Sequence, residues 1–249
     1  MYDQLVKTLA KRLLIGSPWE ETARRAHHAL TRNRGSLYDA QTIAIMRRVL
    51  RRDSNAIDVG AFEGGMLKHI VRLAPRGKHM AFEPLPDRFE ALKASFPGVE
   101  VHPYAVSDRA GTSDYFRVRQ FPALSGLRPP WRSEGAVETI RVATETLDRL
   151  VPADRTLDFI KVDVEGGELA AFRGALETLR RTRPIVVFEC GAAAAQFGAT
   201  SQAIRAALQD AGLLISTMGA WLARRPPLSG DEFCDLVDGG GEFYFIAHP

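Results

Sequence analysis

The chain has 249 residues, 45% of them hydrophobic and 25% charged, a composition that is average for a soluble domain and excludes a disordered tail or a collagen-like chain. With only two cysteines, Cys190 and Cys234, the chain is not a disulfide scaffold. The two cysteines are not spaced as zinc ligands either, and this cysteine usage predicts a cytoplasmic protein. The formal charge of +3 divides unevenly: residues 1–55 carry 11 basic and 5 acidic residues, and residues 56–249 carry 22 and 25, so the surplus lies in the N-terminal arm and nucleic-acid binding is not expected.

Residues 1–54 are predicted to form a helical N-terminal extension, and residues 55–249 the main domain. Within the extension, a turn is expected at Asn33–Ser36, followed by a helix that begins at Asp39 and ends at Arg52. The positive charge of this basic arm has three interpretations. It is a solvated surface, a homodimer contact, or a peripheral contact with an anionic membrane or glycolipid.

From residue 55 onward, short apolar runs alternate with helical patterns at about 64–74, 86–96 and 167–182. This alternation is typical of the α/β class and predicts a doubly wound, mostly parallel seven-stranded sheet. The last strand is expected to be an antiparallel edge or insertion strand, a common addition to such sheets. The predicted strands are 56–60, 79–83, 99–106, 157–163, 184–189, 213–218 and 242–246.

Two further alternating segments, 114–119 and 137–142, flank a connection without periodicity at Gln120–Trp131. Long connections of this kind are usually functional or disordered, and the Phe, Leu and Trp content argues against disorder. We therefore expect this segment to act as a lid over the acceptor.

Acidic side chains mark the carboxyl ends of five successive predicted strands, where open α/β sheets bind ligands. A single acid in such a place is often only a helix N-cap, but five in a row favour a ligand site. The residues concerned are Asp58 before Gly60-Ala61-Phe62, Glu83 before Pro84, Asp108 after Ser107, Asp163 with Glu165, and Glu189.

The spacing of the glycines argues against a dinucleotide as this ligand. Gly60, Gly64 and Gly65 do not fit the G-x-G-x-x-G fingerprint, and Glu63 would repel phosphates. A cationic ligand with a ribose and no phosphate fits better, and S-adenosyl-L-methionine is such a ligand. We expect Glu83 to accept from both ribose hydroxyls, Asp108 from the adenine amine, and Asp58, Asp163 or both to face the methionine end.

The ordered motifs resemble the FkbM family of adenosylmethionine-dependent methyltransferases. They are Asp58-Val59-Gly60-Ala61-x-x-Gly64, Phe82-Glu83-Pro84, Ala105-Val106-Ser107-Asp108-x-x-Gly111, Ile160-Lys161-Val162-Asp163-Val164-Glu165-Gly166 and Pro184–Glu189. The resemblance implies a class I, Rossmann-like methyltransferase fold and methylation of a hydroxyl on a sugar, glycolipid or polyketide. It also implies a cofactor site at Gly60 and its neighbours, Glu83, Asp108 and Asp163. Phe62 and Gly167 depart from the pattern, which commonly has Asn and an aromatic residue there.

Methyl transfer to a hydroxyl requires a group that takes the proton of the alcohol. Glu165 is the preferred base, and Glu189 and Asp163 are the other candidates. The alternative is that Glu165 or Glu168 caps or charges the N-terminus of the helix that begins at Gly167. A metal between Asp163 and Glu189 is not predicted, because the spacing gives no ligand set.

Two other classes of function stay open at this point. One is a nicotinamide-dependent oxidoreductase or epimerase on a similar sheet, against which Glu63 and the glycine spacing count. The other is a non-catalytic adenosylmethionine-binding module. The expected partner is a small-molecule, glycan or lipid acceptor.

Overall fold

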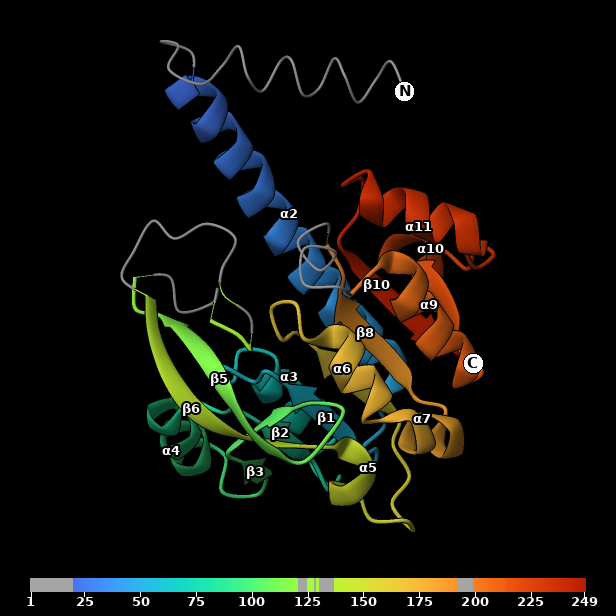
Figure 1. Ribbon diagram of the computed structural model, residues 1–249. Coiled ribbons are helices and arrows are strands. Elements are labelled where there is room, and N and C mark those ends of the chain that lie inside the picture. The colour runs from blue at the N-terminus through green and yellow to red at the C-terminus, as the bar shows by residue number, and fades with distance from the viewer. Residues whose placement is uncertain (1–19, 121–124, 128, 130–136, 192–198) are drawn as a thin grey trace. The chain divides into compact units, whose positions relative to one another are not determined.

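The computed structural model describes residues 20–120, 125–127, 129, 137–191 and 199–249, with side chains from residue 34 onward. The chain forms two compact units, residues 1–41 and 42–249, and each is considered by itself. The seven-stranded sheet and every candidate site residue belong to the second unit (Figure 1).

The helix α2 (Glu20–Val49) is continuous through the segment where a turn was expected. The predicted turn at Asn33–Ser36 is therefore wrong, and so is the predicted helix end at Arg52. A glycine in a helix interior costs about 1 kcal/mol relative to alanine, and this is too little for Gly35 to break a helix of 30 residues.

The main unit alternates strands and helices as the sequence predicts. Its strands are β1 (Ala56–Val59), β2 (Met80–Phe82), β3 (Glu100–His102), β4 (Tyr104–Val106), β5 (Gly111–Val118), β6 (Val137–Glu145), β7 (Phe159–Val162), β8 (Ile185–Glu189), β9 (Leu214–Thr217) and β10 (Tyr244–His248). Its helices are α3 (Leu67–Leu73), α4 (Pro86–Ser95), α5 (Leu147–Leu150), α6 (Glu168–Arg173), α7 (Leu176–Thr182), α9 (Ser201–Asp210), α10 (Met218–Leu222) and α11 (Gly230–Asp238).

The main sheet has seven strands in the order β3-β2-β1-β7-β8-β10-β9. All pairings are parallel except those of β10, which runs antiparallel to β8 and to β9. The predicted doubly wound, mostly parallel seven-stranded sheet is thus confirmed. The last strand was expected to be either an edge strand or an inserted strand, and β10 is inserted between β8 and β9.

The strand predicted at 99–106 is wrong in one respect, because it is divided at Pro103 into β3 and β4. Proline has no backbone N–H to donate to a ladder, so pairing is interrupted there. β3 stays in the main sheet, while β4 joins β5 and β6 in a second sheet of order β4-β6-β5. β5 and β6 are the two strands predicted at 114–119 and 137–142, and they form an antiparallel hairpin.

The helix predicted at 167–182 is also divided, into α6 and α7, with Gly174 at the break. A Cβ at Gly174 would overlap the carbonyl oxygen of Ser107, so the absence of a side chain lets the break pack against the end of β4. Among the described residues, no helix combines the length and the apolar character that a membrane span needs.

Candidate active site

One face of the main sheet carries polar side chains near the carboxyl ends of its parallel strands. Asp58 of β1 pairs with Lys161 of β7, so the two side chains share a face. The same alternation brings Asp163, just after β7, next to Glu189 of β8, which pairs with Tyr244 of β10. The residues between them point to the opposite face and belong to the buried core: Ile57, Val59, Ile160, Val162, Phe188 and Phe245.

Three carboxylates meet at this edge. One oxygen from each of Asp163, Glu165 and Glu189 lies within 4.8 Å of the others. Lys161 Nζ lies 2.8 Å from Asp163 Oδ2, and the Tyr244 hydroxyl donates to the same oxygen at 2.7 Å. The three residues predicted to be catalytic are therefore side by side. We call these three carboxylates, together with Lys161 and Tyr244, the carboxylate cluster.

The members of the cluster differ in acidity because their donors are unequal. Burial alone would raise the pKa of Asp163, but the charge of Lys161 and the hydrogen bonds from Lys161 and Tyr244 hold it below its ordinary value. Burial, together with the charge of Asp163, raises the pKa of Glu165 and that of Glu189 well above the ordinary value. Asp163 is thus the most acidic of the three, and Glu165 and Glu189 hold their protons to a higher pH than an ordinary glutamate does.

Asp58 is a buried carboxylate without a full set of partners. It is 1% exposed, and burial raises its pKa against the lowering effect of Lys161. The backbone N–H of Leu67 faces it, but no donor among the described residues reaches either oxygen in ordinary hydrogen-bond geometry. A buried carboxylate of this kind fits a ligand that brings a cationic or donor group.

The turn after β1 is held against its neighbours by close backbone contacts. Gly60 has a φ of 78°, and a Cβ there would overlap the carbonyl oxygen of Asp163. The N–H groups of Gly60 and Ala61 both donate to the Phe82 carbonyl at 3.0 Å. The Phe62 N–H donates to Glu83 Oε2 at 2.9 Å. The turn therefore joins the ends of β1, β2 and β7.

Phe62, which departs from the family pattern, has a φ of 52° and lies under a cation. The guanidinium of Arg88 stacks 3.8 Å from the centre of the Phe62 ring, and Arg88 also pairs with Glu63 at 3.0 Å. Arg88 therefore contacts both the ring of Phe62 and the carboxylate of Glu63, the acid whose charge argues against a phosphate ligand.

Glu83 directly follows β2 and is 3% exposed. Its Oε2 accepts from Phe62 and its Oε1 accepts from the N–H of Leu85 at 3.0 Å. Each carboxylate oxygen has two acceptor positions, so one on each oxygen remains for two hydroxyl donors. Burial raises the pKa of Glu83 to about 7. Pro84, the next residue, is buried.

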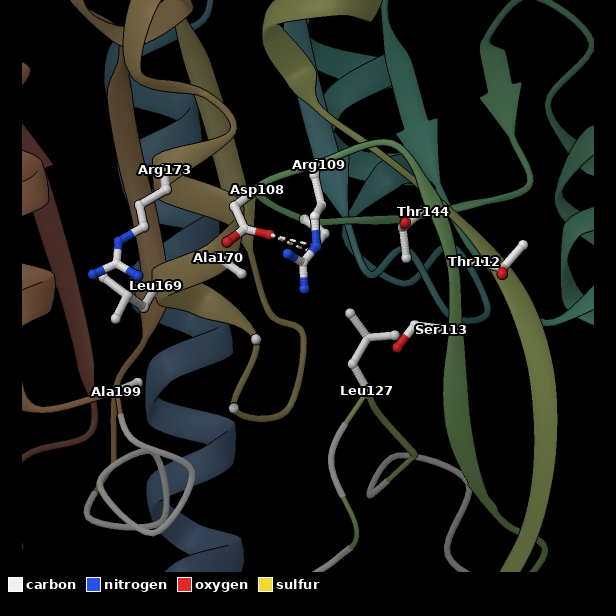
Figure 2. A pocket seen from close by; sticks show the side chains of 13 residues that line it. Asp108, Arg109, Thr112, Ser113, Leu127, Thr144, Leu169, Ala170, Arg173 and Ala199 are labelled. Atoms are coloured by element: carbon white, nitrogen blue, oxygen red, sulfur yellow. Dashed lines mark hydrogen bonds and ion pairs between the residues drawn. The ribbon is translucent and has the colours of Figure 1, made fainter.

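Ser107 and Asp108 follow β4, and so they stand at the end of the second sheet rather than of the main one. The Ser107 hydroxyl lies 3.4 Å from Asp108 Oδ1. Both residues line a cavity together with Gly166 and Gly167, the residues that follow Glu165 (Figure 2).

Glu168 holds the turn that presents Glu165. Its Oε1 accepts from the N–H groups of Val164 at 3.3 Å and Gly166 at 3.1 Å, and Glu165 itself has a φ of 49°. Gly167 is the N-cap of α6, and no side chain caps it. Glu168 rather than Glu165 therefore has the structural role that was the alternative for Glu165.

We expect Glu168→Ala to lower the free energy of unfolding by about 1–3 kcal/mol, because two backbone donors lose their acceptor in a buried turn. Urea denaturation at neutral pH measures this change. Glu177→Ala, which removes an acid of 74% exposure on α7, is the matched control and is expected to change little. Equal losses in the two variants would contradict the role given to Glu168.

Sequence reasoning missed Tyr244, which lies 81 positions from Asp163 in the chain. It also missed the contact of Gly126, where a Cβ would lie 3.0 Å from the carbonyl oxygen of Glu165. Gly126 is held by paired hydrogen bonds with Phe116. Leu127 lines the cavity, but most of the predicted lid, including Phe121 and Trp131, lies outside the described residues.

Comparison with known proteins gives a match to one family model. Residues 58–214, more than half of the chain, match the model described as the methyltransferase FkbM domain. No curated protein sequence matches the chain.

Several solved structures resemble the chain at low identity. A precorrin-6y C5,15-methyltransferase from Geobacter metallireducens is 16% identical over 85% of this chain and 86% of its own, with a TM-score of 0.42. A SAM-dependent methyltransferase from Aquifex aeolicus is 13% identical over 84% and 87%, with a TM-score of 0.43. A TehB-like SAM-dependent methyltransferase from Corynebacterium glutamicum is 13% identical over 92% and 98%, with a TM-score of 0.44.

Proposed function

This chain belongs to the FkbM methyltransferase family, as the motifs predicted, and on that premise we propose that it methylates a hydroxyl on a sugar, glycolipid or polyketide-like small molecule. It is an S-adenosyl-L-methionine-dependent methyltransferase. The observation that carries the finer proposal is the carboxylate cluster, in which one oxygen from each of Asp163, Glu165 and Glu189 lies within 4.8 Å of the others.

The residues around the strand ends fit adenosylmethionine. When bound, this cofactor supplies a methyl group made electrophilic by a sulfonium. The two free acceptor positions of Glu83 suit the two ribose hydroxyls, and Asp108 suits the adenine amine. The buried carboxylate of Asp58, which lacks a full set of partners, suits the amino group at the methionine end.

The carboxylate cluster supplies the proton acceptor. An acceptor hydroxyl that approaches Glu165 would donate its proton to the carboxylate as its oxygen gains the methyl group. Lys161 and Tyr244 hold Asp163 as the charged neighbour, so the proton does not pass to Asp163. Because the pKa of Glu165 is raised, it is a stronger base than an ordinary glutamate.

The experiment that tests this proposal is incubation of the protein with methyl-labelled adenosylmethionine and candidate acceptors, namely sugars, glycolipids and small metabolites. We expect a product that gains one methyl group on oxygen, detected by mass analysis and located by fragmentation. Methyl transfer to carbon or nitrogen would contradict the proposal. Cofactor binding with no product from any acceptor would favour a non-catalytic binding module.

The raised pKa of Glu83 makes cofactor affinity depend on pH. Hydroxyl donors prefer the charged carboxylate, so affinity is present above a pH of about 7 and is lost as the pH falls through that value. We expect affinity for adenosylmethionine to be roughly tenfold lower at pH 6 than at pH 8. Calorimetry at both values measures it, and a Glu83→Gln variant, which cannot titrate there, is expected to show a flatter profile.

A further inference from the structure

A cavity of about 310 Å³ lies between the start of α6 and the β5–β6 hairpin (Figure 2). Its lining is polar and includes Ser107 and Asp108, which belong to the proposed cofactor site, whereas the other lining side chains have no role in that site. Two arginines and four hydroxyl groups line it: Arg109, Arg173, Ser107, Thr112, Ser113 and Thr144.

The two arginines of this cavity are poorly neutralised. Arg109 is 87% exposed and has one acidic neighbour, Asp108, at 4.0 Å. In the part of the chain that the structure describes, no acidic side chain forms an ion pair with Arg173. Arg109 extends its guanidinium between α6 and the hairpin, as Figure 2 shows. With two arginines against one aspartate, the lining has a positive surplus that favours an anion.

The nature of the side chains narrows the ligand further. Guanidinium groups bind carboxylates and phosphates through paired hydrogen bonds. On the hairpin, the Thr112 hydroxyl accepts from Arg141 at 2.6 Å and the Ser113 hydroxyl donates to the Asp114 carbonyl at 3.3 Å. The Thr112 proton, the Ser113 lone pairs and the Thr144 hydroxyl remain for a hydroxylated ligand. A volume of about 310 Å³ is at the low end for small-molecule pockets, so the site suits one sugar ring rather than a large ligand.

The cavity is lined by chain neighbours of Glu165, although the five residues of the carboxylate cluster are not themselves among its lining. Gly166 and Gly167 line its wall and directly follow Glu165. Leu127 lines it too, next to Gly126, whose backbone lies against Glu165. The segment that carries Glu165 thus forms part of the cavity wall, and the proposal below needs a ligand that extends from the cavity past this segment to the Glu165 carboxylate.

We propose that this cavity binds an anionic, sugar-sized part of the methyl acceptor, with Arg109 and Arg173 on its carboxylate or phosphate and the hairpin hydroxyls on its hydroxyl groups. This inference rests on the proposed function, since it names the acceptor class for the same reaction. It assigns Arg109 and Arg173 to acceptor binding rather than to the cofactor.

The test compares the double variant Arg109→Met/Arg173→Met with the unaltered protein and with Arg225→Met, which removes an exposed arginine outside the cavity lining. Each protein is saturated with S-adenosyl-L-homocysteine and titrated calorimetrically with glucuronate, with glucose 6-phosphate and with glucose. We expect one or both anions to bind the unaltered protein and the Arg225→Met variant at least about tenfold more tightly than the double variant. The anion that binds more tightly identifies the carboxylate or the phosphate source, and glucose is expected to bind all three proteins weakly.

Three results would overturn the proposal: no binding of either anion up to about 20 mM, equal binding by the double variant, or glucose binding as tightly as the anions. A loss of S-adenosyl-L-homocysteine affinity in the double variant would also overturn it, because the cavity would then belong to the cofactor. If the unaltered protein does not bind S-adenosyl-L-homocysteine, the role assigned to the cofactor site fails instead. Thermal melting of each variant verifies that it is folded.

Discussion

Replacing Glu165 by Gln is expected to lower the turnover number by about 10²–10⁴-fold while leaving the dissociation constant of adenosylmethionine nearly unchanged. The amide keeps the size of the side chain but cannot take up the acceptor proton. Glu165 lies within 4.8 Å of Asp163 and Glu189, and no hydrogen bond among the described residues gives it a structural task. Single-turnover kinetics with excess enzyme measure the chemical step, and calorimetry measures cofactor affinity.

The control for this variant is Glu177→Gln, a change of the same chemistry at a 74% exposed position on α7. It is expected to keep full activity. Full activity of Glu165→Gln would remove Glu165 as the base, and a matching loss in Glu189→Gln would then assign that role to Glu189. A loss of cofactor affinity that equals the loss of turnover would show that Glu165 holds the cofactor instead.

Replacing Glu83 by Ala is expected to lower the affinity for adenosylmethionine by at least about a hundredfold. Two hydrogen bonds from ribose hydroxyls to a carboxylate are worth about 1.5–3 kcal/mol each, and Ala offers neither. Calorimetric titration measures the loss. Glu90→Ala, an exposed acid on α4, is the control and is expected to bind as the unaltered protein does.

Glu83 also accepts the N–H groups of Phe62 and Leu85, so its removal loosens the turn after β1 as well. The variant Glu83→Gln separates the two effects, because the amide oxygen still accepts one backbone hydrogen bond. We expect Glu83→Gln to melt close to the unaltered protein and yet to bind the cofactor more weakly. An unchanged affinity in both variants would exclude Glu83 as the ribose acceptor.

The positions of the strands along the chain and the acids at their ends were predictable because both depend on local sequence. An apolar run and the acid that ends it are adjacent in the chain, and parallel strands bring their carboxyl ends to one edge. For this reason the sequence alone predicts that Asp163, Glu165 and Glu189 lie at one edge of the sheet. The lowered pKa of Asp163 depends first on Lys161 and then on Tyr244. The contact with Tyr244 was not predictable, since Tyr244 reaches Asp163 only because β10 is inserted beside β8.

The errors in the predicted elements come from backbone effects that periodicity does not detect. Pro103 lies in an apolar run that alternates like one strand, yet its missing N–H divides that run between two sheets. Gly174 divides a helix because the end of β4 packs against its backbone, a contact over 67 positions in the chain between Ser107 and Gly174. Gly35, in contrast, does not divide α2, because the cost of one glycine is small compared with the stability of a helix of 30 residues.

The division at Pro103 separates the protein into parts that can change independently. The carboxylate cluster and Glu83 are built on the main sheet, whereas the threonine and serine hydroxyls of the cavity are carried by the β5–β6 hairpin. A hairpin can be grafted between relatives at its two ends, where Gly111 and Thr144 are paired, without altering the order of the main sheet. Under the acceptor role proposed for the cavity, chimaeras of this kind would keep the cofactor-binding residues of one parent and take the acceptor preference of the other.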